Sequence, residues 1–310
     1  TLIKDLDLRL GEFFSEKIEE FIASLSLKKE KIEAIGSHGQ TIKHEPNSIP
    51  PFSLQIGNPQ FISNKLGIKT IANFRDDDIA KGGQGAPLSP IFHKEVFAKE
   101  NKKRVIINIG GITNISLLGG AKLLGFDTGP GNCLLDIWTK KNKRGNYDNE
   151  GNWAKSGTVD QDLLDIMMKD NYFSLEPPKS TGPDYFNLSW LQDCLMKLKR
   201  EIDPRDTQAT LVELTASSLS NSLQRLKIVN ENIYICGGGV HNKFLMRRIS
   251  SLLGEKCYTT DKLGLDPDYI EAICFAWLAY KRVNNIKFNM SAITGSNEKV
   301  FLGKVYLPTK

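Results

Sequence analysis

The sequence predicts an α/β fold divided into two domains, and three observations support this prediction. Short apolar runs of the type found in buried strands alternate with amphipathic helical segments along most of the chain. Glycine-rich turns follow several of the apolar runs. The 310 residues, of which 40% are hydrophobic, are enough for two domains of ordinary size with substantial cores.

The first domain is expected at residues 1–104, together with about residues 285–310. Its opening helix is predicted from apolar residues near helical spacing: Leu6, Leu8, Leu10, Phe13, Phe14, Ile18, Phe21 and Ile22. Further along we expect a strand at 32–36, a turn at 37–41, a helix that starts at 61–65 and ends before Gly67, a strand at 69–73, a loop at 74–90 and a helix at about 91–99. Prolines 46, 50, 51 and 59 predict loops, and the charged break at residues 100–104 predicts the domain boundary.

The second domain is expected at residues 105–284, with an insert at about 142–189. We expect strands near 105–109, 113–118, 122–126 and 232–236, and helices at about 133–140, 210–226, 242–253 and 271–282. The insert is polar, but aromatic residues are scattered through it: Trp153, Tyr172, Phe173, Tyr185 and Phe186. These aromatic residues predict a segment packed over the core rather than a disordered loop.

Composition argues against several classes of protein. The sequence contains no run of eighteen apolar residues, and its first ten residues carry charges where a secretion signal needs an apolar block. The five cysteines lack CxxC spacing, so we expect neither a disulfide framework nor a zinc site, and a reducing cytoplasm is the natural location. The net charge of +5 is spread over short Lys runs without an aromatic stacking pattern, which favours solvated helix faces and turns over a nucleic-acid patch. The lack of a long apolar run argues against a membrane span.

A candidate phosphotransferase site lies between residues 105 and 132. Two apolar runs flank Gly110-Gly111, and the next run ends at Asp127, directly before Thr-Gly-Pro-Gly. A glycine pair lets a nucleotide phosphate approach the backbone and is expected to offer unobstructed N–H donors. Asp127 at the strand end is a candidate general base. The alternative is that Asp127 only caps the following turn.

A second glycine turn, Gly237-Gly238-Gly239, lies between a predicted strand and a predicted helix. Such a turn permits close approach of a ligand and directs N–H groups toward it. A purely structural turn is the alternative. The presence of two such turns in one chain favours nucleotide binding.

At seven places, and in the same order, the chain resembles anhydro-N-acetylmuramic acid kinases. The matching segments are His38-Gly-Gln-Thr41, Phe74-Arg75, Gly82-Gly-Gln-Gly-Ala-Pro-Leu88, Asn108-Ile-Gly-Gly111, Phe126-Asp-Thr-Gly-Pro-Gly-Asn132, Lys179-Ser-Thr-Gly182 and Glu271-Ala272. The resemblance runs from about Leu6 to the C-terminal tail. That family belongs to the actin, hexokinase and Hsp70 group, so the resemblance implies two ribonuclease-H-like domains with a nucleotide in the cleft between them.

The resemblance also implies an activity. Members of the family are cytoplasmic bacterial enzymes of peptidoglycan recycling that use ATP and Mg2+. They phosphorylate 1,6-anhydro-N-acetylmuramic acid at its 6-oxygen while water opens the anhydro bridge, which gives N-acetylmuramic acid 6-phosphate. The expected partner is therefore a small anhydro amino sugar, and a homodimer is expected by the same resemblance. Magnesium in such sites is held largely through nucleotide phosphates, so we expect no metal ligands in the protein.

The resemblance assigns roles to individual residues. Asp127 is the expected base for the attacking water. Arg75 and Glu271 are expected to contact the sugar, and the turn that contains His38 and Thr41 is expected near it. The remaining assignments are nucleotide contacts: Gly110, Gly111 and Thr113 as the second phosphate loop, and Gly237, Gly238, Gly239 and Asn242 as the adenosine loop.

Each sugar contact has a structural alternative. Arg75 precedes three aspartates and would then form a surface ion pair of little energetic value. Glu271 would be an ordinary carboxylate at a helix N-terminus, and His38 a hydrogen-bonded structural histidine. The Lys179-Ser-Thr-Gly182 segment either contacts substrate or merely packs, and the sequence leaves both interpretations open.

One departure from the family pattern concerns the start of the chain. Members begin with a strand and a Gly-Thr-Ser-x-Asp-Gly loop, the first phosphate loop, which the present sequence lacks. We therefore expect an N-terminally truncated first domain, an unpaired edge on the strand at 32–36, and little or no kinase activity of the chain as written. The alternatives are a remnant that binds sugar or nucleotide without turnover, and a different sugar or acid kinase of the same fold.

Overall fold

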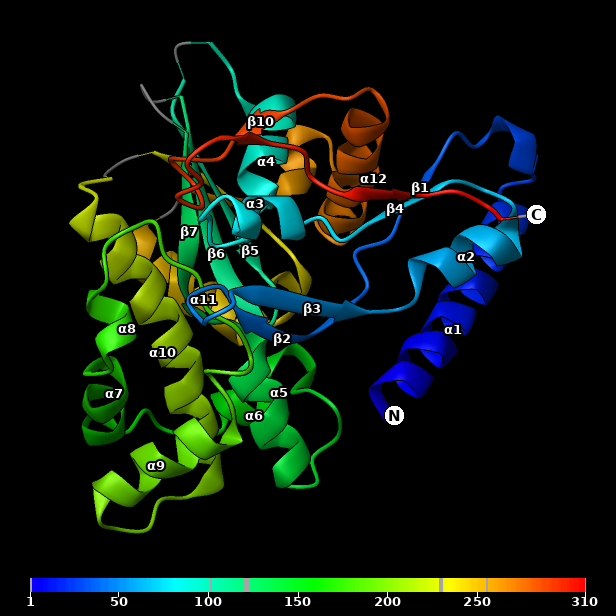
Figure 1. Ribbon diagram of the computed structural model, residues 1–310. Coiled ribbons are helices and arrows are strands. Elements are labelled where there is room, and N and C mark those ends of the chain that lie inside the picture. The colour runs from blue at the N-terminus through cyan, green and yellow to red at the C-terminus, as the bar shows by residue number, and fades with distance from the viewer. Residues whose placement is uncertain (1, 101, 120–122, 229–230, 255, 310) are drawn as a thin grey trace. The chain divides into compact units, whose positions relative to one another are not determined.

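The computed structural model describes residues 2–309 except 101, 120–122, 229–230 and 255. Helices and strands alternate along the chain, as the sequence predicts for an α/β protein (Figure 1). The chain forms two compact units, residues 1–88 with 271–310, and residues 89–270.

The first unit contains three small sheets. Strands β1 (Ile35–Gly36), β4 (Thr70–Ala72) and β12 (Lys304–Tyr306) form one sheet in the order β1-β4-β12, with β1 parallel and β12 antiparallel to β4. Strands β2 (Gln40–Glu45) and β3 (Phe52–Ile56) form a hairpin, and β10 (Phe288–Asn289) pairs with β11 (Lys299–Val300). Among the described strands, β1 pairs only with β4.

The helices of the first unit agree in part with the sequence. The opening helix is confirmed as α1 (Leu2–Ser24), and α2 (Pro59–Leu66) lies where a helix is predicted. Asn58 caps α2 through a hydrogen bond of 2.9 Å to the N–H of Phe61, and Gly67 ends it in the left-handed conformation. Helix α3 (Asp76–Ala80) replaces part of the loop expected at 74–90.

The strands of the hairpin β2–β3 were not predicted. The loop predicted at Pro59 is wrong, because Pro59 is the first residue of α2. The prolines that suggested a loop, Pro46, Pro50 and Pro51, all lie in the connection between the two strands. There their missing N–H groups cost no ladder hydrogen bond. The strand expected at 32–36 is also shorter than predicted, since only Ile35-Gly36 pairs.

The second unit is built on a five-stranded sheet in the order β7-β6-β5-β8-β9. The strands are β5 (Arg104–Ile109), β6 (Ile112–Leu118), β7 (Leu124–Pro130), β8 (Asn232–Cys236) and β9 (Cys257–Thr259). Strand β6 is antiparallel to β5 and β7, whereas β5, β8 and β9 are parallel to one another. The strands predicted at 105–109, 113–118 and 232–236 are confirmed, and residue 122, the expected start of the third, lies outside the described residues.

Helices pack on this sheet and carry most of the core. They are α4 (Ser89–Phe97), α5 (Asn132–Lys141), α6 (Asn152–Lys155), α7 (Gln161–Met168), α8 (Asn171–Ser174), α9 (Leu188–Leu198), α10 (Pro204–Arg225) and α11 (Lys243–Leu253). Figure 1 shows α7, α8 and α9 beside the long helix α10. The insert is packed as expected, because Leu163, Met167, Tyr172 and Phe186 are buried in the same core cluster as the strands.

Two helices lie in a different unit from the domain expected for them. Helix α4 lies in the second unit, where Pro90 packs closely on Gly125 of β7. Helix α12 (Ile270–Val283) lies, from Glu271 on, in the first unit, where Phe275 stacks on Phe74 with ring centroids 5.1 Å apart. The compact units therefore change at 88/89 and 270/271 rather than at 104 and 284.

None of the helices in the described part of the chain is both long enough and apolar enough to cross a membrane.

Candidate active site

Asp127 lies in β7, buried with only 5% of its surface exposed. Its backbone N–H donates to the carbonyl of Lys179 at 3.2 Å, and its own carbonyl accepts from the hydroxyl of Tyr172 at 2.8 Å. Its carboxylate oxygen Oδ2 accepts from the backbone N–H of Thr181 at 3.0 Å. Strand β7 extends three residues past Asp127 and leads through Gly131 into α5. The carboxylate is thus held in a fixed orientation, as a general base must be.

The glycine turn 110–111 packs directly against the start of α5. The carbonyl of Gly110 accepts from the N–H of Asn132 at 2.8 Å, and that of Gly111 accepts from Gly131 at 2.9 Å and Cys133 at 3.1 Å. The N–H of Gly110 itself donates to the carbonyl of Ile112 at 3.2 Å. The expectation of unobstructed donors is therefore wrong for Gly110, because the tight turn between β5 and β6 uses its N–H.

The space beside these two glycines is nonetheless open. A Cβ atom placed on Gly111 would approach no closer than 3.8 Å to Cys133, and one on Gly110 no closer than 3.7 Å to Ile112. Thr113 differs, since it is fully buried and its hydroxyl lacks a hydrogen-bond partner among the described residues. The two glycines leave room for a ligand group, whereas the Thr113 hydroxyl is enclosed.

The second glycine turn lies next to the first, at the carboxyl ends of the parallel strands β5 and β8. Gly237 has a positive φ of 81° and donates its N–H to the carbonyl of Pro267 at 3.1 Å, so this donor is also used. Gly239 packs against the side chain of Ile109, whereas a Cβ on Gly238 would have its nearest neighbour 3.9 Å away, at Asn132. Gly238 is therefore the open member of the triplet.

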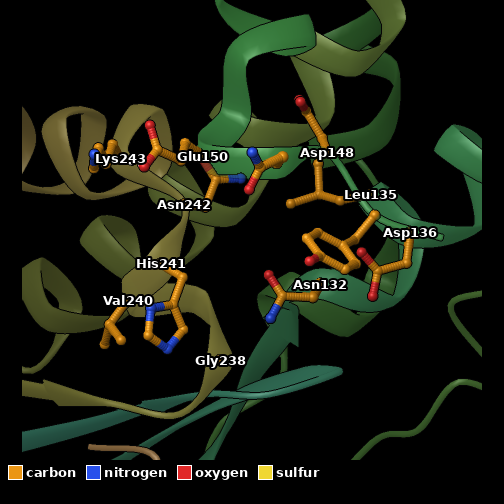
Figure 2. A pocket seen from close by; sticks show the side chains of 12 residues that line it. Asn132, Leu135, Asp136, Asp148, Glu150, Gly238, Val240, His241, Asn242 and Lys243 are labelled. Atoms are coloured by element: carbon orange, nitrogen blue, oxygen red, sulfur yellow. Dashed lines mark ion pairs between the residues drawn. The ribbon is translucent and has the colours of Figure 1, made fainter. Parts of the chain in front are cut away.

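A cavity of about 600 Å³ opens beside Gly238 (Figure 2). It is lined by Asn132, Leu135, Asp136, Tyr147, Asp148, Asn149, Glu150, Gly238, Val240, His241, Asn242 and Lys243. Figure 2 shows Asn132 and Asp136 of α5 on one side, and Val240, His241 and Lys243 on the other. All the lining residues belong to the second unit, and the volume is that of a typical small-molecule site.

Several polar groups around the cavity have structural partners. Asn242 caps α11 through a 2.9 Å hydrogen bond from the N–H of Leu245, and Lys243 pairs with Glu150 at 2.6 Å. The Asp148 carboxylate accepts from the N–H groups of Trp153 and Ala154. At Asp136, burial raises the carboxyl pKa to about 6 despite the opposing charge of Lys140. A carboxylate in this position can accept hydrogen bonds from hydroxyl groups of a ligand.

In the first unit the structure brings Arg75 and His38 together. Arg75 donates from Nη2 to Nε2 of His38 at 2.9 Å and from Nη1 to the carbonyl of Gly85 at 2.7 Å. Because Nδ1 of His38 lies 2.9 Å from the carbonyl of Gly39, which can only accept, Nδ1 carries the hydrogen and Nε2 accepts. Burial, with the Arg75 cation, lowers the pKa of His38 to about 3, so the ring is neutral at physiological pH.

Asp78 holds the Gly82–Leu88 segment that follows Arg75. Its carboxylate accepts from the N–H of Gly85 at 2.7 Å and from the hydroxyl of Thr294 at 2.8 Å. Burial raises the pKa of Asp78, and these hydrogen bonds oppose that rise. Asp78 thus fixes the loop that carries one of the carbonyl acceptors of Arg75.

The other two residues expected near the sugar lie elsewhere in the first unit. The hydroxyl of Thr41, in β2, accepts from Nε2 of Gln55 on the paired strand at 3.1 Å. Glu271 is exposed in the first turn of α12. Within the described residues no three or more His, Cys, Asp or Glu side chains form a group that could hold a metal ion.

Comparison with known proteins decides the family. The family model described as anhydro-N-acetylmuramic acid kinase matches residues 1–308. The chain belongs to this family. The anhydro-N-acetylmuramic acid kinase of Pasteurella multocida is 47% identical over 305 residues, which cover 97% of this chain and 81% of that protein. The enzyme of the same name from Coxiella burnetii (strain Dugway 5J108-111) is 43% identical over 306 residues, with 97% and 82% covered.

Among solved structures, one similar chain is the activator of the 2-hydroxyisocaproyl-CoA dehydratase from Clostridium difficile with bound ADPNP. Its TM-score is 0.35 at 18% sequence identity, and the match covers 65% of this chain and 70% of that chain.

The sequence did not predict the groups that contact the expected site residues or complete the cavity. Tyr172 and Lys179 contact Asp127 from the insert, and Asp78 supports the loop beside Arg75. Asp136 sits on an amphipathic helix, where a polar residue is the default. The Lys179-Ser-Thr-Gly182 segment carried the one usable signal, because it is among the segments that resemble the family.

Proposed function

We propose that this protein is an ATP-dependent kinase that converts 1,6-anhydro-N-acetylmuramic acid and water to N-acetylmuramic acid 6-phosphate in the bacterial cytoplasm. One observation carries the proposal: the buried Asp127 carboxylate is held in β7 by the N–H of Thr181, and this strand leads into α5, whose start packs on the open glycine turn and lines a cavity of about 600 Å³. Family membership supplies the substrate class.

In the proposed reaction Asp127 acts as general base. Its carboxylate accepts a proton from a water molecule, whose oxygen forms a bond to C1 of the sugar. The bond between C1 and the bridging 6-oxygen breaks, and this oxygen attacks the γ-phosphorus of ATP. The bond from the γ-phosphorus to the β,γ-bridging oxygen breaks, and ADP leaves. Each step is balanced without any reactant other than water, ATP and the sugar.

The nucleotide is proposed to occupy the cavity beside Gly238. Gly111 and Gly238 leave open space in which phosphates can approach the backbone, and Asp136 lies one helical turn, about 6 Å along the axis, beyond Asn132. In ATP the ribose is attached directly to the phosphates. With the phosphates beside Gly111 and Gly238, we propose that the ribose hydroxyls donate hydrogen bonds to the Asp136 carboxylate. Mg2+ is proposed to enter bound to the ATP phosphates, and no residue of the chain is assigned to it.

The strand order supports an actin-like ATPase fold for the second unit. Numbered along the chain, the order is 3-2-1-4-5, with the second strand antiparallel to its neighbours, as in a ribonuclease-H-like domain. In open sheets of this kind ligands bind at the carboxyl ends of the parallel strands. Gly110 and Gly237 lie at those ends, directly after β5 and β8.

Recognition of the sugar is proposed for residues of the first unit. Arg75, oriented by His38 and the carbonyl of Gly85, offers a planar cation to the carboxylate of the lactyl group or to sugar oxygens. Thr41 and Glu271 are proposed as further polar contacts.

The test is an assay of ADP release by the protein, expressed from its complete reading frame, with three acceptors. We expect release that depends on 1,6-anhydro-N-acetylmuramic acid and little release with N-acetylmuramic acid or N-acetylglucosamine. Equal rates with the unbridged sugars would replace the proposal with a general amino-sugar kinase. If none of the three sugars supports ADP release, the proposal of a kinase is replaced by that of a protein that binds its ligand without turnover.

A further inference from the structure

The Lys179-Ser-Thr-Gly182 segment lies along Asp127 and holds it at two points. Asp127 donates its backbone N–H to the carbonyl of Lys179 at 3.2 Å, and Thr181 donates its N–H to Oδ2 of Asp127 at 3.0 Å. One contact fixes the backbone and the other fixes the carboxylate. The segment therefore restrains both the backbone and the carboxylate of Asp127.

Tyr172 holds Asp127 at a third point and connects it to the Lys179 side chain. The Tyr172 hydroxyl donates to the carbonyl of Asp127 at 2.8 Å. The Lys179 ammonium donates to the carbonyl of Tyr172 at 3.1 Å and lies 4.6 Å from the centre of the Tyr172 ring. Asp127, Tyr172 and Lys179 thus form a closed set of contacts, and all three are buried.

The surroundings of Tyr172 make this arrangement rigid. Asp170 caps α8 through a 2.9 Å hydrogen bond from the N–H of Tyr172 and accepts at 2.8 Å from both Tyr185 and Trp190. Arg225 of α10 donates to the carbonyl of Phe173 at 2.8 Å. Helix α8 is therefore tied at its start and along its length to the core of the second unit.

We propose that Tyr172 and Lys179 are positioning residues for Asp127, and that the Lys179 ammonium, held on Tyr172, supplies positive charge that favours the ionised form of the buried carboxylate. The inference rests on the proposed function, in which Asp127 is the base. Burial alone favours the protonated carboxyl, which cannot accept a proton from water, whereas the hydrogen bond from Thr181 and a nearby cation both favour the ionised form.

The charge state of Lys179 has several contributors. Burial and the cation of Arg225 lower its pKa to about 8, whereas the carboxylates of Glu176 and Asp127 oppose this fall. The pKa of Tyr172, which contacts both Asp127 and Lys179, is raised by burial and by the charge of Asp127. Lys179 is therefore charged at neutral pH and loses its proton at mildly alkaline pH.

The closing experiment measures the titration of Asp127 directly, independently of turnover. The Cγ signal of Asp127 in 13C-labelled protein, assigned with Asp127→Asn, is followed against pH in wild type, Lys179→Met and Lys179→Arg. We expect the titration of Asp127 to move to higher pH by roughly one unit in Lys179→Met, and Lys179→Arg to stay close to wild type. Lys197→Met, an exposed lysine of α9, is the matched control.

The positioning role is read from kinetics. Tyr172→Phe keeps the ring and removes the hydroxyl donor, and we expect roughly tenfold lower kcat with unchanged KM for ATP and an unshifted acid limb of the pH profile. Tyr269→Phe, an exposed tyrosine, is the control. An unshifted Asp127 titration in folded Lys179→Met overturns the charge role. If that variant does not fold, wild-type kcat in Tyr172→Phe overturns the positioning role. Absence of sugar phosphorylation by wild type refutes the proposed function instead.

Discussion

The backbone N–H of Thr181 donates a hydrogen bond to Oδ2 of Asp127 at 3.0 Å, although 54 positions separate the two residues in the chain. The contact joins the edge strand β7 of the second unit's sheet to the polar insert. The insert therefore contributes directly to the candidate active site.

Asp127→Asn is expected to remove the base while it keeps the acceptor oxygen for Thr181. The kcat should fall by roughly 10²- to 10⁴-fold, the usual contribution of general base catalysis, with little change in KM for ATP. Steady-state kinetics with both substrates measure this. A loss confined to KM would show that Asp127 only binds the sugar.

Asp136→Asn is expected to weaken discrimination between ATP and 2′-deoxy-ATP. Wild type should prefer ATP by roughly tenfold, the value of one hydrogen bond to a charged group, and the variant should lose most of this preference. Because burial raises the pKa of Asp136 to about 6, the KM for ATP should also rise as the pH falls below 6 in wild type alone. Asp193→Asn, on the exposed face of α9, serves as control. Equal preference in wild type and Asp136→Asn would assign Asp136 a different role.

Arg75→Lys and His38→Phe are expected to raise the KM for the sugar without changing that for ATP. Lysine cannot reproduce the guanidinium contacts to His38 and Gly85, and Phe keeps the ring that stacks on Phe275 but lacks the Nε2 acceptor. An increase of roughly tenfold for each is expected. Coincident changes in both KM values would point to misfolding, which thermal unfolding would reveal.

Acid should destabilise the fold through its buried histidines. Burial lowers the pKa of His38 to about 3, of His44 to about 4 and of His93 to about 3. The unfolded chain then binds protons below about pH 6.5 that the folded chain does not, so the free energy of unfolding falls as the pH is lowered from 7 to 5. His93 alone should contribute about 2 kcal/mol of this loss at pH 5.

Chemical denaturation at pH 7 and pH 5 checks this prediction. His93→Gln should reduce the difference between the two pH values, since Gln can keep a hydrogen bond to Ser116 but does not titrate. His241→Gln is the control, because His241 is exposed. An unchanged pH dependence in His93→Gln would mean that His93 is not the titrating group.

The sequence predicts those parts of the fold and site that depend on local pattern. The apolar runs that became β5, β6 and β8, and the glycine turns directly after β5 and β8, follow from residue order. Neither strand of the hairpin β2–β3 was predicted, because Pro46, Pro50 and Pro51 mark a turn without indicating that strands flank it.

The partners of the site residues depend on tertiary packing and could not be read from local sequence. Tyr172 reaches Asp127 across 45 positions, and only the fold brings them together. Arg75 precedes three aspartates, which suggested an ion pair, yet it donates to His38 and Gly85, while Asp76 pairs with Lys304 at 2.7 Å. Asp136 has no local signal, since its importance comes from the cavity that other segments complete.

The most direct test of the central claim is the mass of the product formed from 1,6-anhydro-N-acetylmuramic acid and ATP by the protein expressed from its complete reading frame. The account predicts a single sugar product that has gained one phosphoryl group and one water molecule, formed together with ADP and absent with Asp127→Asn. A product that gains phosphate without water, or ADP formed beside an unchanged sugar, would contradict it.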